Sequence, residues 1–244
     1  MVDPKINIIH ERLGNIRNIV AVSSGKGGVG KSLVASVVAL ILARKGYRVG
    51  LFDLDFTGPS THVILGIGEL HLKEEKGIIP PEVYGLRYMS IVYYARERAS
   101  PLRGVEVSNA LIELLAVTLW DRLDFLILDM PPGIGDTTLD ILRLVKNVKF
   151  LVVTTPSRLA FETVAKLLDL LSELKVSIIG VIENMKMYNS EFIRHQVEKK
   201  GVRFCGEIPY DPALEESMSH VDRLLETRFG KGLEAITEKN LKSL

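Results

Sequence analysis

The chain has 244 residues, a formal net charge of +1 and 47% hydrophobic residues. Its balanced charge gives no general argument for a nucleic-acid partner, and no uninterrupted apolar run approaches the length of a membrane-spanning helix. The one cysteine, Cys205, excludes an internal disulfide and suits a reducing cytoplasm. Residues 1–17 carry charges throughout, so we expect no secretory signal and a cytoplasmic location.

Short apolar runs alternate with helix-forming stretches along the whole chain. After a polar lead-in at residues 1–17, we predict a strand at 19–22, a helix at 33–44, a strand at 49–53, an excursion with a small hairpin at 66–84 and a strand at 86–91. There follow a helix at 105–120, a strand at 125–129, a helix at 137–145 capped by Asp136, a strand at 150–154 and a helix at 160–174. The last predictions are a strand at 176–182, a helix at 191–200, a strand at 204–208 and C-terminal helices over 213–244.

Near-continuous apolar strands separated by helices indicate a mainly parallel sheet with helices on both faces. No linker of low complexity divides the sequence. We therefore predict a single three-layer α/β domain over residues 1–244. Ligands of such sheets bind beyond the carboxyl ends of the strands, where residues 25–32, Asp53, Asp55 and Asp129 would converge.

The loop at residues 25–32 reads Gly-Lys-Gly-Gly-Val-Gly-Lys-Ser and fits the phosphate-binding pattern G-x-x-x-x-G-K-[ST]. Glycines let the backbone N–H groups wrap a triphosphate, and the N-terminus of the next helix adds partial positive charge. A glycine-rich turn can match by chance, but here a strand precedes the loop and a helix follows it. The predicted nucleotide-binding residues are Gly25, Lys26, Gly27, Gly28, Val29, Gly30, Lys31, Ser32 and Leu33.

Four side chains carry the expected chemistry of this loop. Lys31 would contact the β- and γ-phosphates, and the Ser32 hydroxyl would bind Mg²⁺. Asp129 ends an apolar strand and is the expected Mg²⁺ partner. Asp53 and Asp55 follow another strand; one carboxylate could support the water shell of the metal while the other orients an attacking water. Loop capping is the alternative for both, and an ordinary strand-end aspartate is the alternative for Asp129.

The second lysine of the loop, Lys26, resembles the deviant Walker A lysine of the superfamily that includes MinD, ArsA and the nitrogenase iron protein. This resemblance implies a homodimer in which Lys26 reaches the phosphates of the partner copy. It also implies that Asp55 positions the water, which leaves Asp53 in the outer shell of the metal. The alternative is that Lys26 is a solvated surface lysine.

Several later motifs occur in order and extend the resemblance over residues 19–212. They are Asp53-x-Asp55-x-x-Gly58-Pro59-Ser60, Asp129-x-Pro131-Pro132-Gly133, Thr154-Thr155-Pro156, Gly180-Val181-Ile182-Glu183-Asn184-Met185 and Gly206-Glu207-Ile208-Pro209. The series resembles the Mrp/ApbC family of ATPases, which is linked to iron–sulfur cluster carriage. The resemblance implies that Asn184 contacts adenine and that the turn from Pro209 to Asp211 closes over it. Asn184 could also be a simple turn residue.

The chain departs from that family at one important point. Cluster-carrying members have a Cys-x-x-Cys pair after the segment that corresponds to Glu183–Met185, but residues 186–192 contain no cysteine. Two copies of Cys205 could supply only two of the four thiolates that a four-iron cluster normally needs. Cys205 also lies in an apolar strand, where a free cysteine behaves as a small buried hydrophobe. We therefore expect no conventional bridging cluster.

The sequence leaves three functions open. The first is an ATP-hydrolysing homodimer, slow and partner-stimulated, that uses Lys26, Lys31, Asp55 and Asp129 and serves iron–sulfur or metal-cofactor maturation. The second is a MinD-like, ATP-gated recruitment or regulatory switch that carries no cluster. For either function, the partner besides a second copy could be a client protein or a cysteine-bearing paralogue. The third is an adenine-nucleotide binder without turnover. The C-terminal segment 232–244 is expected to pack onto the body rather than on a membrane.

Overall fold

The computed structural model describes residues 4–95 and 105–241. Its centre is an eight-stranded sheet with the order β10-β9-β8-β1-β7-β2-β6-β5. All neighbouring strands pair in parallel except β5, which is antiparallel to β6. The strands are β1 (Ile16–Ser24), β2 (Val49–Asp53), β5 (Glu82–Val83), β6 (Leu86–Ser90), β7 (Leu123–Asp129), β8 (Lys149–Thr154), β9 (Ser177–Lys186) and β10 (Phe204–Pro209).

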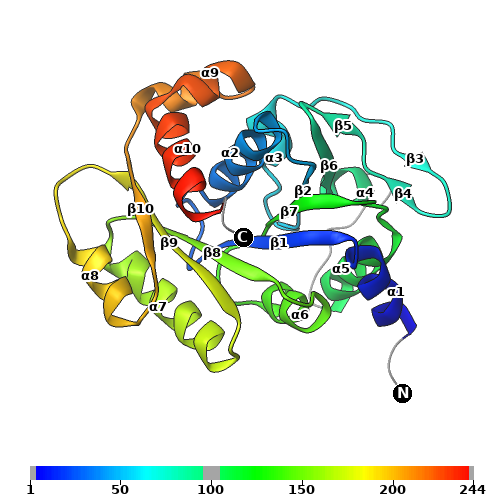
Figure 1. Ribbon diagram of the computed structural model, residues 1–244, viewed down its shortest axis with the longest axis horizontal. Coiled ribbons are helices and arrows are strands. Elements are labelled where there is room, and N and C mark those ends of the chain that lie inside the picture. The colour runs from blue at the N-terminus through cyan, green and yellow to red at the C-terminus, as the bar shows by residue number, and fades with distance from the viewer. Residues whose placement is uncertain (1–3, 96–104, 242–244) are drawn as a thin grey trace.

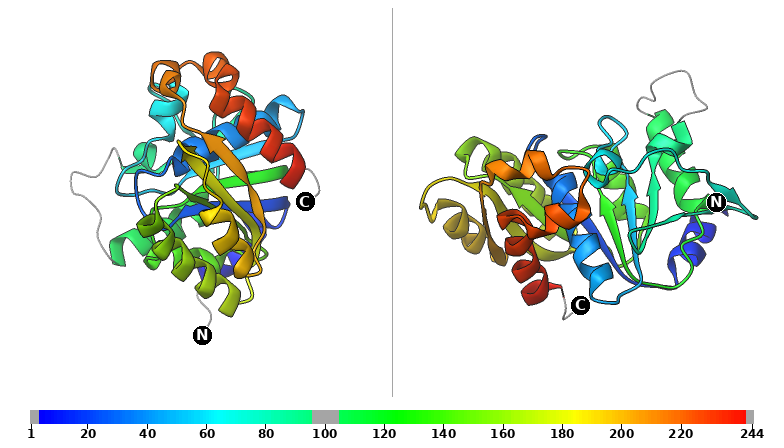
Figure 2. Two further views of the ribbon diagram at one scale, coloured as in Figure 1. Left: turned by 90° about the vertical axis from the view of Figure 1, so that its left-hand side faces the viewer. Right: turned by 90° about the horizontal axis from the view of Figure 1, so that it is seen from above.

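Helices cover both faces of this sheet, as Figure 1 shows. One face carries α2 (Lys31–Arg44), α3 (Thr61–Leu65), the 3₁₀ helix η1 (Pro212–Ser217), α9 (Val221–Glu226) and α10 (Arg228–Asn240). The other face carries α1 (Pro4–Leu13), α5 (Val105–Val117), α6 (Asp136–Leu144), α7 (Arg158–Glu173) and α8 (Phe192–Lys199), while α4 (Ile91–Ala95) follows β6. Figure 2 shows the sheet between these two layers from two further sides. The predicted three-layer α/β fold is confirmed.

Alternating side chains of the central strands divide the core into two halves. In β1, Val20 and Val22 pack toward α2, whereas Ile19 and Ala21 pack toward the opposite layer. Successive residues of a strand point to opposite faces, so a strand buried on both sides needs an apolar residue at nearly every position. This requirement explains why the strands read as continuous apolar runs. The helix α2 is buried around most of its surface because α10 and α3 pack against it in addition to the central strands.

Most predicted elements are confirmed, but some boundaries were wrong. Residues 4–13 form a helix that the polar lead-in did not indicate, and β1 begins at Ile16. The predicted strand at 176–182 continues to Lys186, because β10 pairs with it as far as Pro209. The hairpin expected within 66–84 is the antiparallel pair of β3 (Lys73–Glu74) and β4 (Ile78–Ile79).

The predicted cap of α6 was wrong by one residue. Gly135 is the N-cap, in an extended conformation, and Asp136 is the first helical residue, with no side-chain hydrogen bond to the cap. The Gly135 carbonyl accepts the first helical hydrogen bonds, from Thr138 and Leu139. A carboxylate in the first turn interacts favourably with the helix dipole, so Asp136 stabilises α6 from the first helical position instead of the N-cap.

The C-terminal helix packs onto the body of the domain, as expected. Leu233, Ile236 and Leu241 are buried in the same core half as α2, while Leu244 lies outside the described residues. Lys45 at the end of α2 pairs with Glu234 and Glu238 of α10. Within residues 4–95 and 105–241, the helices are too short or too polar to cross a bilayer.

Replacement of Leu233 tests this packing. Leu233→Ala should lower the free energy of unfolding by about 2–5 kcal/mol, because it leaves a cavity between α10 and α2. Lys239→Ala, on the exposed side of the same helix, should change it by less than about 0.5 kcal/mol. Denaturant titration measures both. Equal, small effects would contradict the packing of α10 described here.

Candidate nucleotide-binding site

The glycine-rich loop follows β1 and leads directly into α2. Gly28 and Gly30 have φ of 75° and 82°, a conformation that other residues adopt only with strain. Asn184 of β9 lies beneath the loop and donates from Nδ2 to the Val29 carbonyl at 2.9 Å. A Cβ on Gly30 would come within 2.4 Å of that nitrogen. The loop is therefore held in an open backbone curve by its glycines and by a neighbouring strand.

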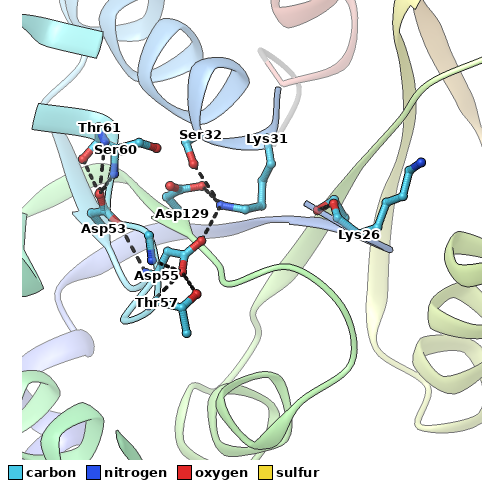
Figure 3. A network of polar contacts seen from close by, with 11 residues as sticks. Lys26, Lys31, Ser32, Asp53, Asp55, Thr57, Ser60, Thr61 and Asp129 are labelled. Carbon is cyan, nitrogen blue, oxygen red and sulfur yellow. Dashed lines mark hydrogen bonds and ion pairs between the residues drawn. The ribbon is translucent and has the colours of Figure 1, made fainter. Parts of the chain in front are cut away.

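Lys31 points from the start of α2 into a group of oxygen atoms, as Figure 3 shows. Its Nζ donates to Asp129 Oδ1 at 2.5 Å and to Ser32 Oγ at 3.0 Å, and lies 4.0 Å from Asp55 Oδ2. The Lys31 side chain is only 6% exposed and that of Asp129 is fully buried. A buried ammonium ion needs such partners, because an unpaired charge in the interior is strongly unfavourable.

Asp129 has a second oxygen that no group satisfies. Its Oδ2 is buried and has no hydrogen-bond partner among the described residues. Burial raises the pKa of Asp129 to about 7, although the charge of Lys31 opposes this shift. A free carboxylate oxygen beside the Ser32 hydroxyl fits the hard oxygen ligands that Mg²⁺ prefers. The residues present therefore suit a magnesium ion.

Asp55 aims one oxygen at this group and uses the other to hold its own loop. Oδ1 accepts hydrogen bonds from the Thr57 amide and hydroxyl and from the Gly58 amide, at 2.7–3.1 Å. Oδ2 is the oxygen that faces Lys31. The register of β2, β7 and β1 places Asp53 beside Asp129 and Asp129 beside Val22, so the strand ends meet as predicted.

The contacts of Asp53 are those of a residue that caps its own loop, which was the alternative to a role in the metal site. Its Oδ1 accepts from the Asp55 amide at 3.1 Å, and its Oδ2 accepts from the amides of Ser60 and Thr61 and from the Thr61 hydroxyl. Burial raises its pKa, and these hydrogen bonds act in the opposite direction. Four hydrogen bonds occupy this carboxylate, so a place in the water shell of a metal stays a prediction for Asp53.

A pocket of about 430 Å³ opens beside the loop and brings several predicted residues together. Lys26, Gly27, Gly28, Gly30, Lys31, Ser32, Leu33, Asp55 and Asp211 line it. Its remaining wall is largely apolar and includes Met185, Tyr210, Pro212, Leu214 and Met218. The sequence interpretation had included Tyr210 in the turn at 209–211 but assigned no role to Met185, Leu214 or Met218. Met185 ended the motif at residues 180–185, and Leu214 and Met218 follow the turn, but no local pattern marked them as part of a pocket.

The family resemblance assigned Asn184 and the turn from Pro209 to Asp211 to contacts with the adenine base. In the structure these residues differ in whether they line the pocket. Asp211 lines the pocket, but its carboxylate also accepts from the Ala213, Arg228 and Phe229 amides and so ties η1 to α10. Asn184 is 2% exposed and contacts the glycine-rich loop instead of lining the pocket. Pro209 ends β10 and does not line the pocket either. Base contact by Asn184 and Pro209 stays a prediction.

Lys26 is exposed and extends away from the carboxylates around Lys31, as Figure 3 shows. Its backbone is fixed, because its carbonyl accepts a hydrogen bond from Ser24 Oγ at 2.9 Å. Within this chain the Lys26 ammonium group therefore points to a different region from that of Lys31. The two lysines of the loop are not equivalent.

Cys205 lies inside the domain and not at the site. It is 4% exposed, and a Cβ on Gly180 of the adjacent strand would come within 2.4 Å of its Sγ. Burial raises the pKa of its thiol to about 11. Over the described part of the chain, no group of three or more His, Cys, Asp or Glu side chains is arranged to hold a metal ion.

The fold and the loop together define a P-loop nucleotide-binding protein of the α/β class. A model of the ParA family, described as NUBPL iron-transfer P-loop NTPase, matches residues 15–241. The chain belongs to this family of P-loop NTPases, as the sequence resemblance predicted.

Curated relatives carry names that concern iron–sulfur clusters. An iron–sulfur cluster carrier protein of Rickettsia felis is 37% identical over 83% of this chain and 64% of its own length. A carrier of Saccharolobus solfataricus is 34% identical over 88% of this chain and 78% of its own length. A chloroplastic Fe-S cluster assembly factor of Arabidopsis thaliana is 39% identical over 84% of this chain and 41% of its own length. The chain spans somewhat less than two thirds of the bacterial carriers that it matches.

Solved structures agree with this fold. A nucleotide-binding protein of Archaeoglobus fulgidus, determined in complex with ADP, has a TM-score of 0.76 and 30% identity, covering 91% of this chain and 93% of its own. The cell division ATPase MinD of Pyrococcus furiosus has a TM-score of 0.68 at 20% identity, covering 93% and 100%. The second likeness concerns the fold alone.

Gly30 provides a direct test of the loop geometry. Gly30→Ala should weaken nucleotide binding by about tenfold or more. Alanine is strained in the left-handed backbone conformation of residue 30, and its Cβ would displace Asn184. Gly232 lies in α10, and a Cβ there would make only an ordinary contact with Ile208, so Gly232→Ala should bind nucleotide normally. Calorimetric titration with Mg·ATP measures the difference. Normal binding by Gly30→Ala would refute this geometry.

Cys205 should react slowly in the folded protein. A thiol pKa near 11 leaves far less thiolate at pH 8 than the ordinary pKa of about 8.5, so alkylation by iodoacetamide should be more than about 100-fold slower than in denaturant. The rate should rise about tenfold per pH unit between pH 8 and 10. Mass spectrometry follows the reaction. A native rate close to the denatured rate would mean that the thiol is accessible.

Proposed function

We propose that this chain is a Mg²⁺-dependent ATPase that works as a homodimer in iron–sulfur cluster or metal-cofactor assembly. The observation that carries the proposal is that Lys31 and Asp55 line one pocket beside a glycine-rich loop, while the buried Asp129 is bonded to Lys31. Lys31 would exchange Asp129 for the phosphates of ATP. The Ser32 hydroxyl and the free oxygen of Asp129 would hold Mg²⁺, which neutralises phosphate charge when bound.

Asp55 is proposed to orient the water that attacks the γ-phosphorus. Its Oδ2 faces the pocket while its Oδ1 is fixed by the loop amides, so the carboxylate has one defined direction. The new bond forms between water oxygen and phosphorus, the bond to the β-phosphate oxygen breaks, and the proton leaves with inorganic phosphate or to solvent. Backbone amides of residues 27–32 stabilise the charge that develops on the phosphate oxygens.

A second copy is proposed to complete the site. Lys26 lines the rim of the pocket but extends away from the carboxylates of its own chain, which favours action on the phosphates of a facing copy. A dimer closed over ATP would open when the γ-phosphate leaves. The observation that supports a second copy is the direction in which the Lys26 side chain extends.

The cellular role rests on the names of the relatives. They are called iron–sulfur cluster carriers or assembly factors, and several are longer than this chain. The buried Cys205 makes a bridging cluster held by two copies of this chain a poor fit. We propose that thiolates come from a client protein or a cysteine-bearing paralogue, and that ATP controls the association.

The alternative is a recruitment switch that handles no cluster. Met187 and Tyr188 occupy the loop after β9 and are 72% and 55% exposed, and Met187 lies two residues after Met185 of the pocket wall. Exposed apolar side chains often mark a protein contact. Partner capture that depends on ATP, without any cluster absorbance after anaerobic reconstitution, would favour this reading.

ATP turnover tests the proposed activity. Lys31→Ala and Asp55→Asn should each lower the rate of phosphate release at least about 100-fold. Asp55→Asn should still bind Mg·ATP, and this form held with Mg·ATP is suited to affinity capture of partners. Lys45→Ala, at the far end of α2, should keep the wild-type rate. Wild-type turnover by either site variant would overturn the assignment.

A further inference from the structure

Tyr88 belongs to a buried chain of hydrogen bonds that ends at Asp55. Tyr88 Oη lies 2.8 Å from Thr61 Oγ1, and Thr61 Oγ1 lies 2.7 Å from Asp53 Oδ2. Asp53 Oδ1 in turn accepts from the Asp55 amide at 3.1 Å. Tyr88, Thr61 and Asp53 are all 0% exposed. Three elements that are separate in sequence, β6, α3 and β2, therefore meet in one polar path.

The direction of each hydrogen bond follows from the groups involved. Asp53 Oδ2 accepts from the Ser60 and Thr61 amides and also from the Thr61 hydroxyl, so this hydroxyl uses its hydrogen toward Asp53. Thr61 can then only accept from Tyr88, which makes Tyr88 the donor. Burial raises the pKa of Tyr88 well above its ordinary value, so this phenol keeps its proton. Both hydrogen bonds therefore donate in one direction, from Tyr88 to Thr61 and from Thr61 to Asp53.

Asp53 uses this support to fix both ends of the loop that carries Asp55. One oxygen holds the Asp55 amide, and the other holds the amides of Ser60 and Thr61, where α3 begins. Between these two points the Asp55 carboxylate holds Thr57 and Gly58. A change in the direction of Asp53 would therefore change where Asp55 Oδ2 points.

Tyr88 has no direct access to a nucleotide. Tyr88, Thr61 and Asp53 do not line the pocket, although Asp55, Gly58 and Ser60 do. Its ring packs against Tyr93 at 6.2 Å between centroids. A phenol this deep in the core would fill the same space as Phe, and its hydroxyl is unfavourable there unless it is bonded.

We propose that Tyr88 and Thr61 are positioning residues for Asp55: they orient Asp53, and Asp53 sets the loop that aims the Asp55 carboxylate at the attacking water. This inference rests on the proposed ATPase function. It assigns the residues to the chemical step and not to nucleotide binding, because the loop at 25–32 holds the phosphates through other elements.

The test compares Tyr88→Phe, Thr61→Val and Thr61→Ser with Tyr93→Phe. Tyr93 is the matched control, since its buried phenol packs on Tyr88 but donates to the Gly68 carbonyl at 3.0 Å. Tyr88→Phe and Thr61→Val should lower kcat about tenfold while the Kd for Mg·ATP stays within about twofold. Thr61→Ser keeps the hydroxyl and should restore most of kcat. Tyr93→Phe should keep the wild-type kcat.

Hydrogen exchange supplies a readout that does not depend on turnover. Amides of residues 54–58 and of Ser60 should exchange faster in Tyr88→Phe and Thr61→Val than in Tyr93→Phe, while those of 25–32 stay unchanged. If Lys31→Ala loses turnover but Tyr88→Phe matches Tyr93→Phe in kcat and in exchange, the positioning role is refuted and the ATPase stands. If the wild-type protein has no turnover, the proposed function fails, and with it the role in the chemical step.

Discussion

A buried ion pair between Lys31 and Asp129 is the interaction on which the site depends. The two charges come from α2 and β7, and their separation of 2.5 Å is set by the parallel pairing of β1 with β7. Burying such a pair brings little net stability, because desolvation offsets most of the attraction. Its presence is better explained by function: a lysine held among carboxylates at the mouth of a glycine-rich loop is ready to receive phosphate groups. The two halves of the core pack on either face of the strands that carry this site.

The sequence predicted the fold class and the charged half of the site because both depend on local patterns. The loop motif is continuous, and Asp53, Asp55 and Asp129 follow apolar strands whose parallel order brings their ends together. It missed Met185 and Leu214 of the pocket wall, since these side chains, from β9 and η1, meet beside the glycine-rich loop only in the folded domain. The chain from Tyr88 through Thr61 was missed for the same reason: its members are 27 residues apart and carry no motif. Local propensity likewise misplaced the α6 cap, which a glycine carbonyl provides.

Cys205, the one cysteine of this chain, lies apart from the residues that line the nucleotide-binding pocket. Its thiol is buried against Gly180, and the segment that follows β9 begins with the exposed side chains of Met187 and Tyr188. Under the proposed function, ATP binding reshapes the edge formed by Asp55, Lys26 and the loop after β9, and another protein supplies the sulfur ligands.

A structure of the protein with magnesium and a non-hydrolysable ATP analogue tests the central claim most directly. The account predicts that Lys31 Nζ leaves Asp129 and lies within hydrogen-bond distance of phosphate oxygens, with the phosphates in the curve of residues 25–32 and Asp129 turned toward the metal. A complex in which the analogue binds elsewhere while the pair between Lys31 and Asp129 stays intact would contradict it.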